Sequence, residues 1–171
     1  MRARLGLIAL VTAISLTACG GGDSTDAAVD TNVEGTETAA PSVTADFGAP
    51  LDLGNGVSVT ISAPEAFTPG DFASNYIPGQ VTDLFTIEVQ NDGTAALDMS
   101  TVVFTATSGG NFCADVLDGD NGITGAPAEP VAAGASVSFK YAIGCDAKAG
   151  DPLELTVAIG ETTAGLTGKL A

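Results

Sequence analysis

Regular alternation of apolar and polar residues is the feature that most constrains the fold of this chain. The alternation runs through residues 57–63, 85–90, 136–143 and 153–159. Successive side chains of a β-strand point to opposite faces, so each of these segments is predicted to be a strand with one buried and one wet face. Such strands need a second apolar layer to cover the buried face, and this requirement favours two packed sheets.

Four further segments complete the predicted strand set. Residues 101–107 and 112–117 are β-branched or apolar, and residues 47–53 and 166–170 are predicted to form the first strand and a short last strand. The separators are rich in Gly, Asn and Asp, which tolerate the backbone angles of tight turns. No segment of the domain has a helical stripe. The sequence therefore predicts an all-β antiparallel sandwich of seven to eight strands.

The N-terminus has the organisation of an export signal. Two arginines, Arg2 and Arg4, precede an uncharged apolar run at 5–16, about half of the roughly 20 residues that span a bilayer. The sequence Leu16-Thr17-Ala18-Cys19 then resembles the bacterial lipobox, which implies cleavage after residue 18 and a diacylglycerol on the Cys19 thiol. An ordinary secretory signal with an incidental cysteine is the alternative. We expect lipid anchoring through Cys19 at the extracytoplasmic face of the cell membrane.

The composition of the rest of the chain indicates a linker followed by a domain, and its charge disfavours anionic partners. Residues 19–45 are small and polar with no aromatic side chain, which predicts a flexible lipidated linker before a domain at 46–171. The chain has 5 basic and 21 acidic residues, a net charge of −16, and both arginines lie in the predicted signal peptide. Such a surface repels phosphates and anionic headgroups, so we expect no nucleic-acid partner and attachment to the membrane only through the lipid.

No catalytic constellation is visible. The chain contains no histidine, which excludes His-dependent nucleophiles and His-ligated metals. Ser138 and Lys140 share a predicted outward strand face, where a lysine stays protonated and cannot activate a serine. We expect a protein that is not an enzyme and has no cofactor. Paired carboxylates acting on glycans remain an open alternative.

Two cysteines remain once Cys19 is assigned to lipid. In an oxidising compartment, Cys113 and Cys145 are predicted to form a disulfide. Cys145 has the parity of the inward residues 137–143, so it is expected to point into the core. Two free thiols or a soft metal site are the alternatives.

Three stretches resemble the telokin-like, immunoglobulin-type domain of secreted proteins and lipoproteins of Gram-positive bacteria. These are Gly56–Pro64, Phe85–Gly93 with Leu97-Asp98 after it, and Ala133–Ala142. They are similar to that family's opening strand, its central strand ending in Asn-x-Gly, and its late alternating strand. The resemblance implies an immunoglobulin-like sandwich at the cell surface, and it carries no catalytic residues.

Two loops are candidate binding sites. Asp118, Asp120 and Asn121, with Asp115 nearby, form an oxygen-rich stretch suited to calcium, although Gly122 and the missing Glu depart from the EF-hand pattern. A polar turn is the alternative. The longest loop, 67–78, presents Phe72, Asn75 and Tyr76 for recognition, unless these residues pack back onto the domain.

We therefore expect a membrane-anchored, non-catalytic binding or adhesion module that engages an envelope protein or surface ligand. The alternatives are a structural or accessory subunit of an envelope complex, a cation-binding protein, or a carboxylate-based protein acting on glycans.

Overall fold

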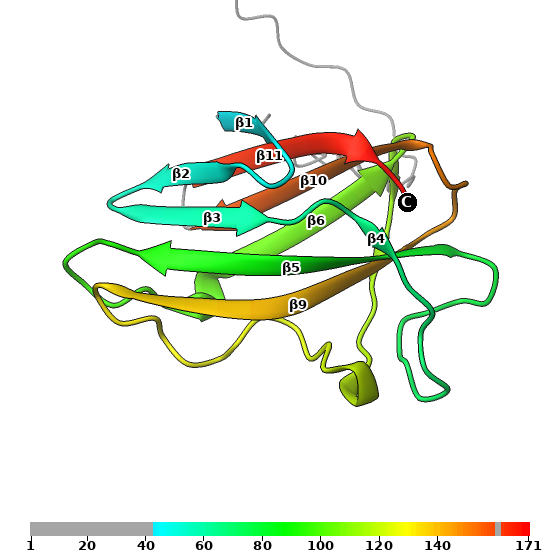
Figure 1. The fold of residues 1–171 in the computed structure, drawn as a ribbon, viewed down its shortest axis with the longest axis horizontal. Helices are drawn as coiled ribbons and strands as arrows, with labels where there is room; N and C mark the ends of the chain where they lie inside the picture. Colours follow the sequence, from blue (N-terminus) through cyan, green and yellow to red (C-terminus); the bar gives the residue numbers. More distant parts are fainter. Residues whose placement is uncertain (1–42, 160–161) are drawn as a thin grey trace, which may run out of the picture. The chain divides into compact units, whose positions relative to one another are not determined.

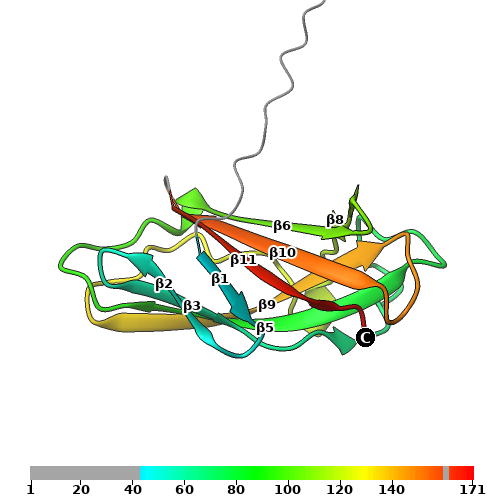
Figure 2. The ribbon, with the colours of Figure 1, turned by 90° about the horizontal axis from the view of Figure 1, so that it is seen from above.

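The structure is a computed structural model that describes residues 43–159 and 162–171, which form two β-sheets packed face to face (Figures 1 and 2). The predicted signal peptide, Cys19 and the linker up to residue 42 lie outside the described residues. Within the described part, helix is limited to two 3₁₀ turns, η1 (Met99–Thr101) and η2 (Gly119–Asn121). None of its helices is long and apolar enough to cross a membrane.

The first sheet has five strands in the spatial order β1-β11-β10-β6-β7. Its strands are β1 (Val43–Asp46), β6 (Val102–Ser108), β7 (Asn111–Phe112), β10 (Pro152–Ile159) and β11 (Thr162–Lys169). All neighbours are antiparallel except β1 and β11, which run parallel.

The second sheet follows the order β2-β3-β5-β9-β8, with β4 also paired to β5. Its strands are β2 (Pro50–Gly54), β3 (Val57–Ile61), β4 (Glu65–Ala66), β5 (Val81–Asn91), β8 (Ala114–Asp115) and β9 (Ala135–Cys145). The two long strands, β5 and β9, pair over their full length, from Val81 opposite Cys145 to Asn91 opposite Ala135.

The predicted fold class is confirmed. Every predicted alternating segment forms a strand. The described residues form eleven strands, of which β4, β7 and β8 have two residues each and the other eight have at least four. Four details differ from the sequence prediction. The last strand is not short, because β11 runs over Thr162–Lys169, and the two-residue strand β4 was not predicted. Residues 43–45, assigned to the linker, belong to β1, whose four residues are too few to show a period. Residues 112–117 are not one strand, because the chain leaves the first sheet after Phe112 and joins the second at Ala114.

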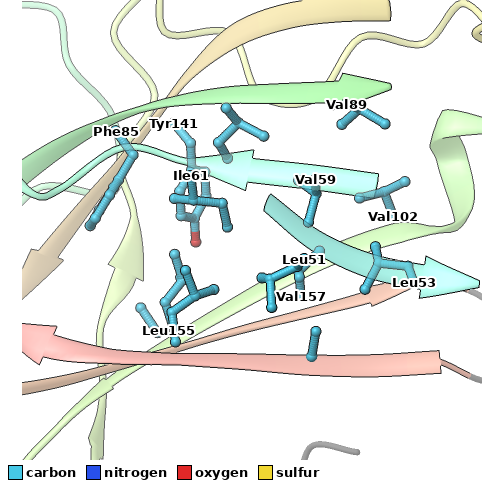
Figure 3. Packing of buried hydrophobic residues seen from close by; sticks show 14 of the residues in the cluster. Leu51, Leu53, Val59, Ile61, Phe85, Val89, Val102, Tyr141, Leu155 and Val157 are labelled. Atoms are coloured by element: carbon cyan, nitrogen blue, oxygen red, sulfur yellow. The ribbon is translucent and has the colours of Figure 1, made fainter. Parts of the chain in front are cut away.

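The core lies between the sheets and is built from the inward residues of both. Figure 3 shows Leu51, Val59 and Ile61 from the second sheet meeting Leu155 and Val157 from the first. A series of aromatic contacts crosses this core. Phe85 stacks on Phe47 with ring centroids 5.8 Å apart and lies 6.2 Å from Tyr141, which in turn lies 5.1 Å from Phe104. Tyr141 and Phe104 therefore connect the centre of the core to β6.

Candidate functional site

A small apolar cluster lies on the outer face of the second sheet. Leu84 and Ala142 have the opposite parity to Phe85 and Tyr141, so they face away from the main core. Ala142 is nevertheless buried, because the loop at 67–80 and the segment at 116–123 cover it. This outer cluster consists of buried Val116, Ile123 and Ala142 with partly buried Phe67, Ala73, Tyr76 and Leu84. The two covering segments thus have a hydrophobic anchor of their own.

The loop and the segment are also joined by hydrogen bonds. Ser74 and Leu117 form an isolated antiparallel bridge, with N···O distances of 2.8 and 3.2 Å. The Asp118 carboxylate accepts the Gly70 N–H at 2.7 Å and the Asn121 side-chain amide at 2.7 Å. These donors, led by the Gly70 N–H, hold the pKa of Asp118 below its usual value. We call the loop 67–80 together with the segment 113–123 the platform.

The predicted calcium ligands have other partners in this structure. Asp118 is 1 % exposed and accepts N–H groups, Asp120 is exposed, and the Asn121 carbonyl accepts the Lys140 ammonium at 3.0 Å. No cluster of three or more His, Cys, Asp or Glu residues suited to a metal occurs within 43–159 and 162–171. A cation here would have to displace these donors. Calcium binding therefore stays a prediction, while the geometry gives Asp118 a role in holding the loop.

The three predicted recognition residues are placed differently. Tyr76 packs onto the outer cluster, as in the alternative considered from sequence, whereas Phe72 is 86 % exposed. Asn75 is exposed with φ of +61°, a left-handed conformation that asparagine tolerates better than most residues. Two further apolar side chains on the platform reach solvent, Ile77 at 65 % and Leu117 at 40 % exposure.

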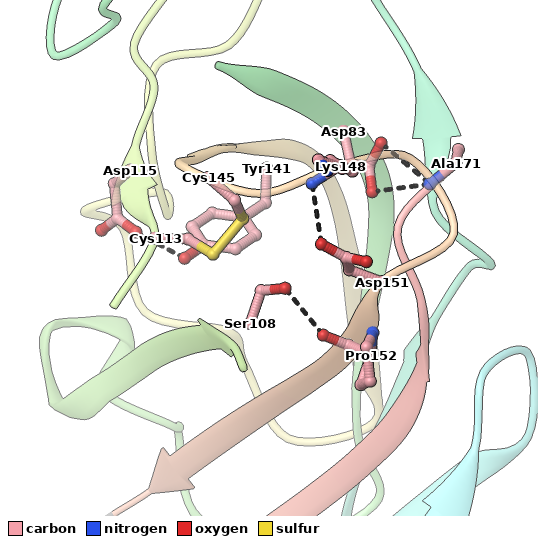
Figure 4. Close-up of a disulfide and its surroundings, with 10 residues drawn as sticks. All are labelled: Asp83, Ser108, Cys113, Asp115, Tyr141, Cys145, Lys148, Asp151, Pro152 and Ala171. Atoms are coloured by element: carbon pink, nitrogen blue, oxygen red, sulfur yellow. Dashed lines mark hydrogen bonds between the residues drawn. A yellow bond between two sulfur atoms is a disulfide. The ribbon is translucent and has the colours of Figure 1, made fainter. Parts of the chain in front are cut away.

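The predicted disulfide is present between Cys113 and Cys145, whose Cα atoms are 4.4 Å apart (Figure 4). Cys145 is 1 % exposed and belongs to the core, as its parity predicted. Cys113 lies between β7 in the first sheet and β8 in the second. The bridge therefore fixes the point where the chain crosses between the sheets, two residues before Asp115.

A cavity of about 190 Å³ lies between β6 and the segment that follows the crossing. Its walls are mainly apolar. The lining residues are Val102, Val103, Phe104, Asp115, Val116, Leu117, Ile123, Gly125, Ala126 and Tyr141. We call it the seam cavity. It shares Asp115, Val116, Leu117 and Ile123 with the platform.

The polar groups of the seam cavity are a tyrosine and an aspartate in contact. The Tyr141 hydroxyl donates to the Asp115 carboxylate at 2.5 Å. Tyr141 is 5 % exposed, and burial together with the neighbouring Asp115 raises the pKa of its phenol far above the usual value. The hydroxyl thus stays protonated, and the pair presents acceptor oxygens and a negative charge to the cavity.

Asp83 and Asp118 are the buried carboxyls of the described residues, and no substrate can reach Asp83. It is 0 % exposed, burial raises its pKa, and its oxygens accept the Ala171 N–H at 3.1 and 3.3 Å. A wider depression of about 600 Å³ lies near Asn91 and Leu97 and is bordered by Ile159 and Thr162.

Sequence reasoning missed the Tyr141–Asp115 pair. Tyr141 was assigned to the core and Asp115 to the oxygen-rich loop, with nothing linking them. One signal was available, because an inward tyrosine on a strand needs a partner for its hydroxyl. Which residue supplies that partner depends on where the chain crosses between the sheets, and a strand pattern does not specify this.

No protein-family model matches the sequence, and no curated protein matches it. Two solved structures share the fold. One is a Bacillus subtilis protein assigned as a lipoprotein, with a TM-score of 0.56 and 16% identity over 70% of this chain. The match covers only 38% of that protein's length. The other is the secreted protein MPT63 of Mycobacterium tuberculosis, with a TM-score of 0.52 and 12% identity over 77% of this chain and 99% of MPT63. Identities this low establish a shared β-sandwich fold and nothing further.

Proposed function

We propose that this protein is a lipid-anchored extracytoplasmic lipoprotein whose sandwich acts as a non-catalytic binding module for another envelope protein. The observation that carries the proposal is the platform, which exposes Phe72 at 86 % and Ile77 at 65 % on a loop tied down elsewhere. Large apolar side chains in water gain free energy when a partner buries them. Aromatic residues are also enriched among those that dominate binding energy.

Packing and hydrogen bonds within the platform support this role. The outer cluster, the Ser74–Leu117 bridge and the Asp118 hydrogen bonds fix the loop before any partner arrives. A loop already held in one conformation loses little entropy on binding. The exposed side chains are thus presented on a pre-ordered surface.

The sequence supports the proposed location in the cell envelope. The lipobox-like segment ending at Cys19 supports membrane attachment, and residues 20–42 supply the linker between anchor and domain. The fold shared with a protein assigned as a lipoprotein and with a secreted protein is compatible with this location. A constitutive accessory subunit would use the same platform, differing only in the lifetime of the complex.

In-cell photo-crosslinking tests the proposal. A photoreactive amino acid replaces Ile77 in the full chain, and a matched probe replaces Asp46, which is exposed on β1. We expect a discrete crosslinked envelope protein from position 77 and none from position 46. With the probe at 77, Phe72→Ser is expected to lower the yield about tenfold, as for an interface aromatic. Equal products from both positions, no product at 77, or an unchanged yield with Phe72→Ser would refute the role of the platform.

A further inference from the structure

One side of the sandwich is closed only in part. The first sheet ends with β6 paired to the two-residue β7, and the second ends with β9 paired to the two-residue β8. β7 covers only Thr107 and Ser108, so residues 102–105 of β6 have no neighbouring strand on their outer side within the described part of the chain. An uncovered strand edge can pair with an extended segment of another chain.

The register shows which backbone groups this edge presents. The Ala106 carbonyl points away from β10, because it accepts the Cys113 N–H at 2.9 Å. Backbone groups of an antiparallel strand alternate between its two edges, so Phe104, two residues earlier, also directs its N–H and C=O outward. Neither group has a hydrogen-bond partner on that side among residues 43–159 and 162–171.

The seam cavity lies directly beside this free edge, since Val103 and Phe104 form part of its wall. At about 190 Å³ it is smaller than the roughly 300–1,000 Å³ pockets that hold drug-sized ligands, and its size suits one long side chain. It combines apolar walls with the Asp115–Tyr141 pair, in which Tyr141 is buried and Asp115 is exposed to solvent. The Asp115 oxygen Oδ1 accepts the tyrosine proton, which leaves Oδ2 and a lone pair of the phenolic oxygen to accept further donors.

We propose that the seam cavity binds a lysine or arginine side chain of an extended peptide segment, which pairs through its backbone with the free edge of β6 at Phe104. The inference rests on the proposed binding function and names the chemistry of the partner. The aliphatic stem of the basic side chain lies along Val102, Phe104 and Leu117. Its cationic head donates to Asp115 and Tyr141.

Charge favours a basic side chain in the seam cavity over an acidic or an apolar one. An acidic side chain would meet the Asp115 carboxylate, and an apolar one would add no donor for Oδ2 of Asp115 or for the free lone pair of the Tyr141 oxygen. A second copy of this chain is disfavoured because each copy has a net charge of −16. Asp115 and Tyr141 are the only ionisable side chains among the residues that line the cavity, so no lysine of this chain neutralises the site from its wall.

Three blocked pentapeptides of Thr and Ser, differing only at the centre, test the proposal. The central residue is lysine, norleucine or glutamate, and binding to the isotope-labelled full chain in detergent is followed by amide NMR. We expect the lysine peptide to shift the amides of Phe104, Asp115 and Leu117. The norleucine peptide should bind about tenfold more weakly, because it lacks the charge-assisted hydrogen bonds, and the glutamate peptide should not bind. Methylating the peptide nitrogen that faces Phe104 should also weaken binding.

Matched variants distinguish a specific effect at the seam cavity from an effect of the protein's net charge. Asp115→Asn keeps an acceptor for the Tyr141 hydroxyl and should lower affinity for the lysine peptide about tenfold, to the norleucine value. Asp46→Asn makes the same charge change on β1, at the opposite edge of the first sheet, and should change affinity less than about twofold. Tyr141→Phe removes the second acceptor without changing charge and should also weaken binding. An unchanged melting temperature of each variant confirms that the fold is kept.

Four results would overturn the inference. These are no binding of the lysine peptide, equal binding of all three peptides, equal losses from Asp115→Asn and Asp46→Asn, or shifts confined to residues away from the seam. The outcome is distinguishable from failure of the proposed function. A protein that crosslinks to an envelope partner through position 77 but ignores the lysine peptide keeps its function and refutes only the seam site.

Discussion

Removal of the Cys113–Cys145 disulfide is expected to destabilise the domain strongly, and the magnitude follows from the chain length that it closes. The two cysteines are 32 residues apart. In the chain-entropy model, a loop of this length lowers the entropy of the unfolded chain by about 12.4 cal/mol/K, which is about 3.7 kcal/mol at 25 °C. For a domain of about 130 residues, with an unfolding entropy near 0.27 kcal/mol/K, this corresponds to a fall in Tm of about 14 °C.

The double variant Cys113→Ala/Cys145→Ala tests this value. Urea unfolding can be followed by tyrosine fluorescence, because the chain has two tyrosines and no tryptophan. Cys145 is buried in the core, so its truncation adds a packing loss to the entropic one, and we expect a total of roughly 4–5 kcal/mol. Reduced wild-type protein separates the two contributions, since it loses only the cross-link. A loss below about 1 kcal/mol in both forms would refute the reasoning, because residual structure in the unfolded chain would then have to account for the loop entropy.

Three further predictions concern single residues. Asp83→Asn should flatten the pH dependence of stability. The folded-state pKa of Asp83 is raised, so the contribution of Asp83 to folding stability is fully present below the unfolded pKa near 3.8 and is lost as the pH rises through the folded pKa. Urea midpoints measured across a pH series would show this dependence. The same slope of stability against pH in wild type and variant would contradict it. Asp118→Ala should speed hydrogen exchange of the Gly70 amide at least about tenfold, because it removes that amide's acceptor. Since the pKa of Asp118 is lowered in the folded state, wild-type protection at Gly70 should fall as the pH drops through that lowered value, and exchange at Gly70 equal to wild type would count against the Asp118 contact. Cys19→Ser should abolish labelling of the protein by radioactive palmitate in cells, whereas persistent labelling would place the lipid elsewhere.

The strands and their faces were predictable because they depend on local periodicity. The inward parity of residues 137–143 predicted burial of Tyr141 and Ile143 correctly, and extending it predicted the buried position of Cys145. The short strand β1 was missed because its pairing with β11 comes from a partner more than 100 residues later in the sequence, from Val43 opposite Ala164 onward. The sequence of a four-residue segment without a visible period does not indicate such a partner strand.

The candidate site was predictable only in pieces. Sequence reasoning selected the loop containing Phe72 and Tyr76 but could not tell which ring packs inward, because both rings are apolar and lie four residues apart in an irregular segment. The structure buries Tyr76 partly in the outer cluster and leaves Phe72 exposed. Asp118 was selected for its oxygen atoms, and one of its donors, the Gly70 N–H, lies 48 residues away in the chain.

The alternating pattern by itself determined the all-β class, the two-layer core and the inward position of Cys145, because strand parity is a property of neighbouring residues. The cysteine count, read together with the predicted export signal, predicted the disulfide. Only the tertiary structure decided that the chain crosses between the sheets at Cys113, which brings Asp115 to Tyr141 and leaves the edge of β6 free beside the seam cavity. That arrangement depends on strand order and on contacts between residues far apart in the sequence, and a local pattern contains neither.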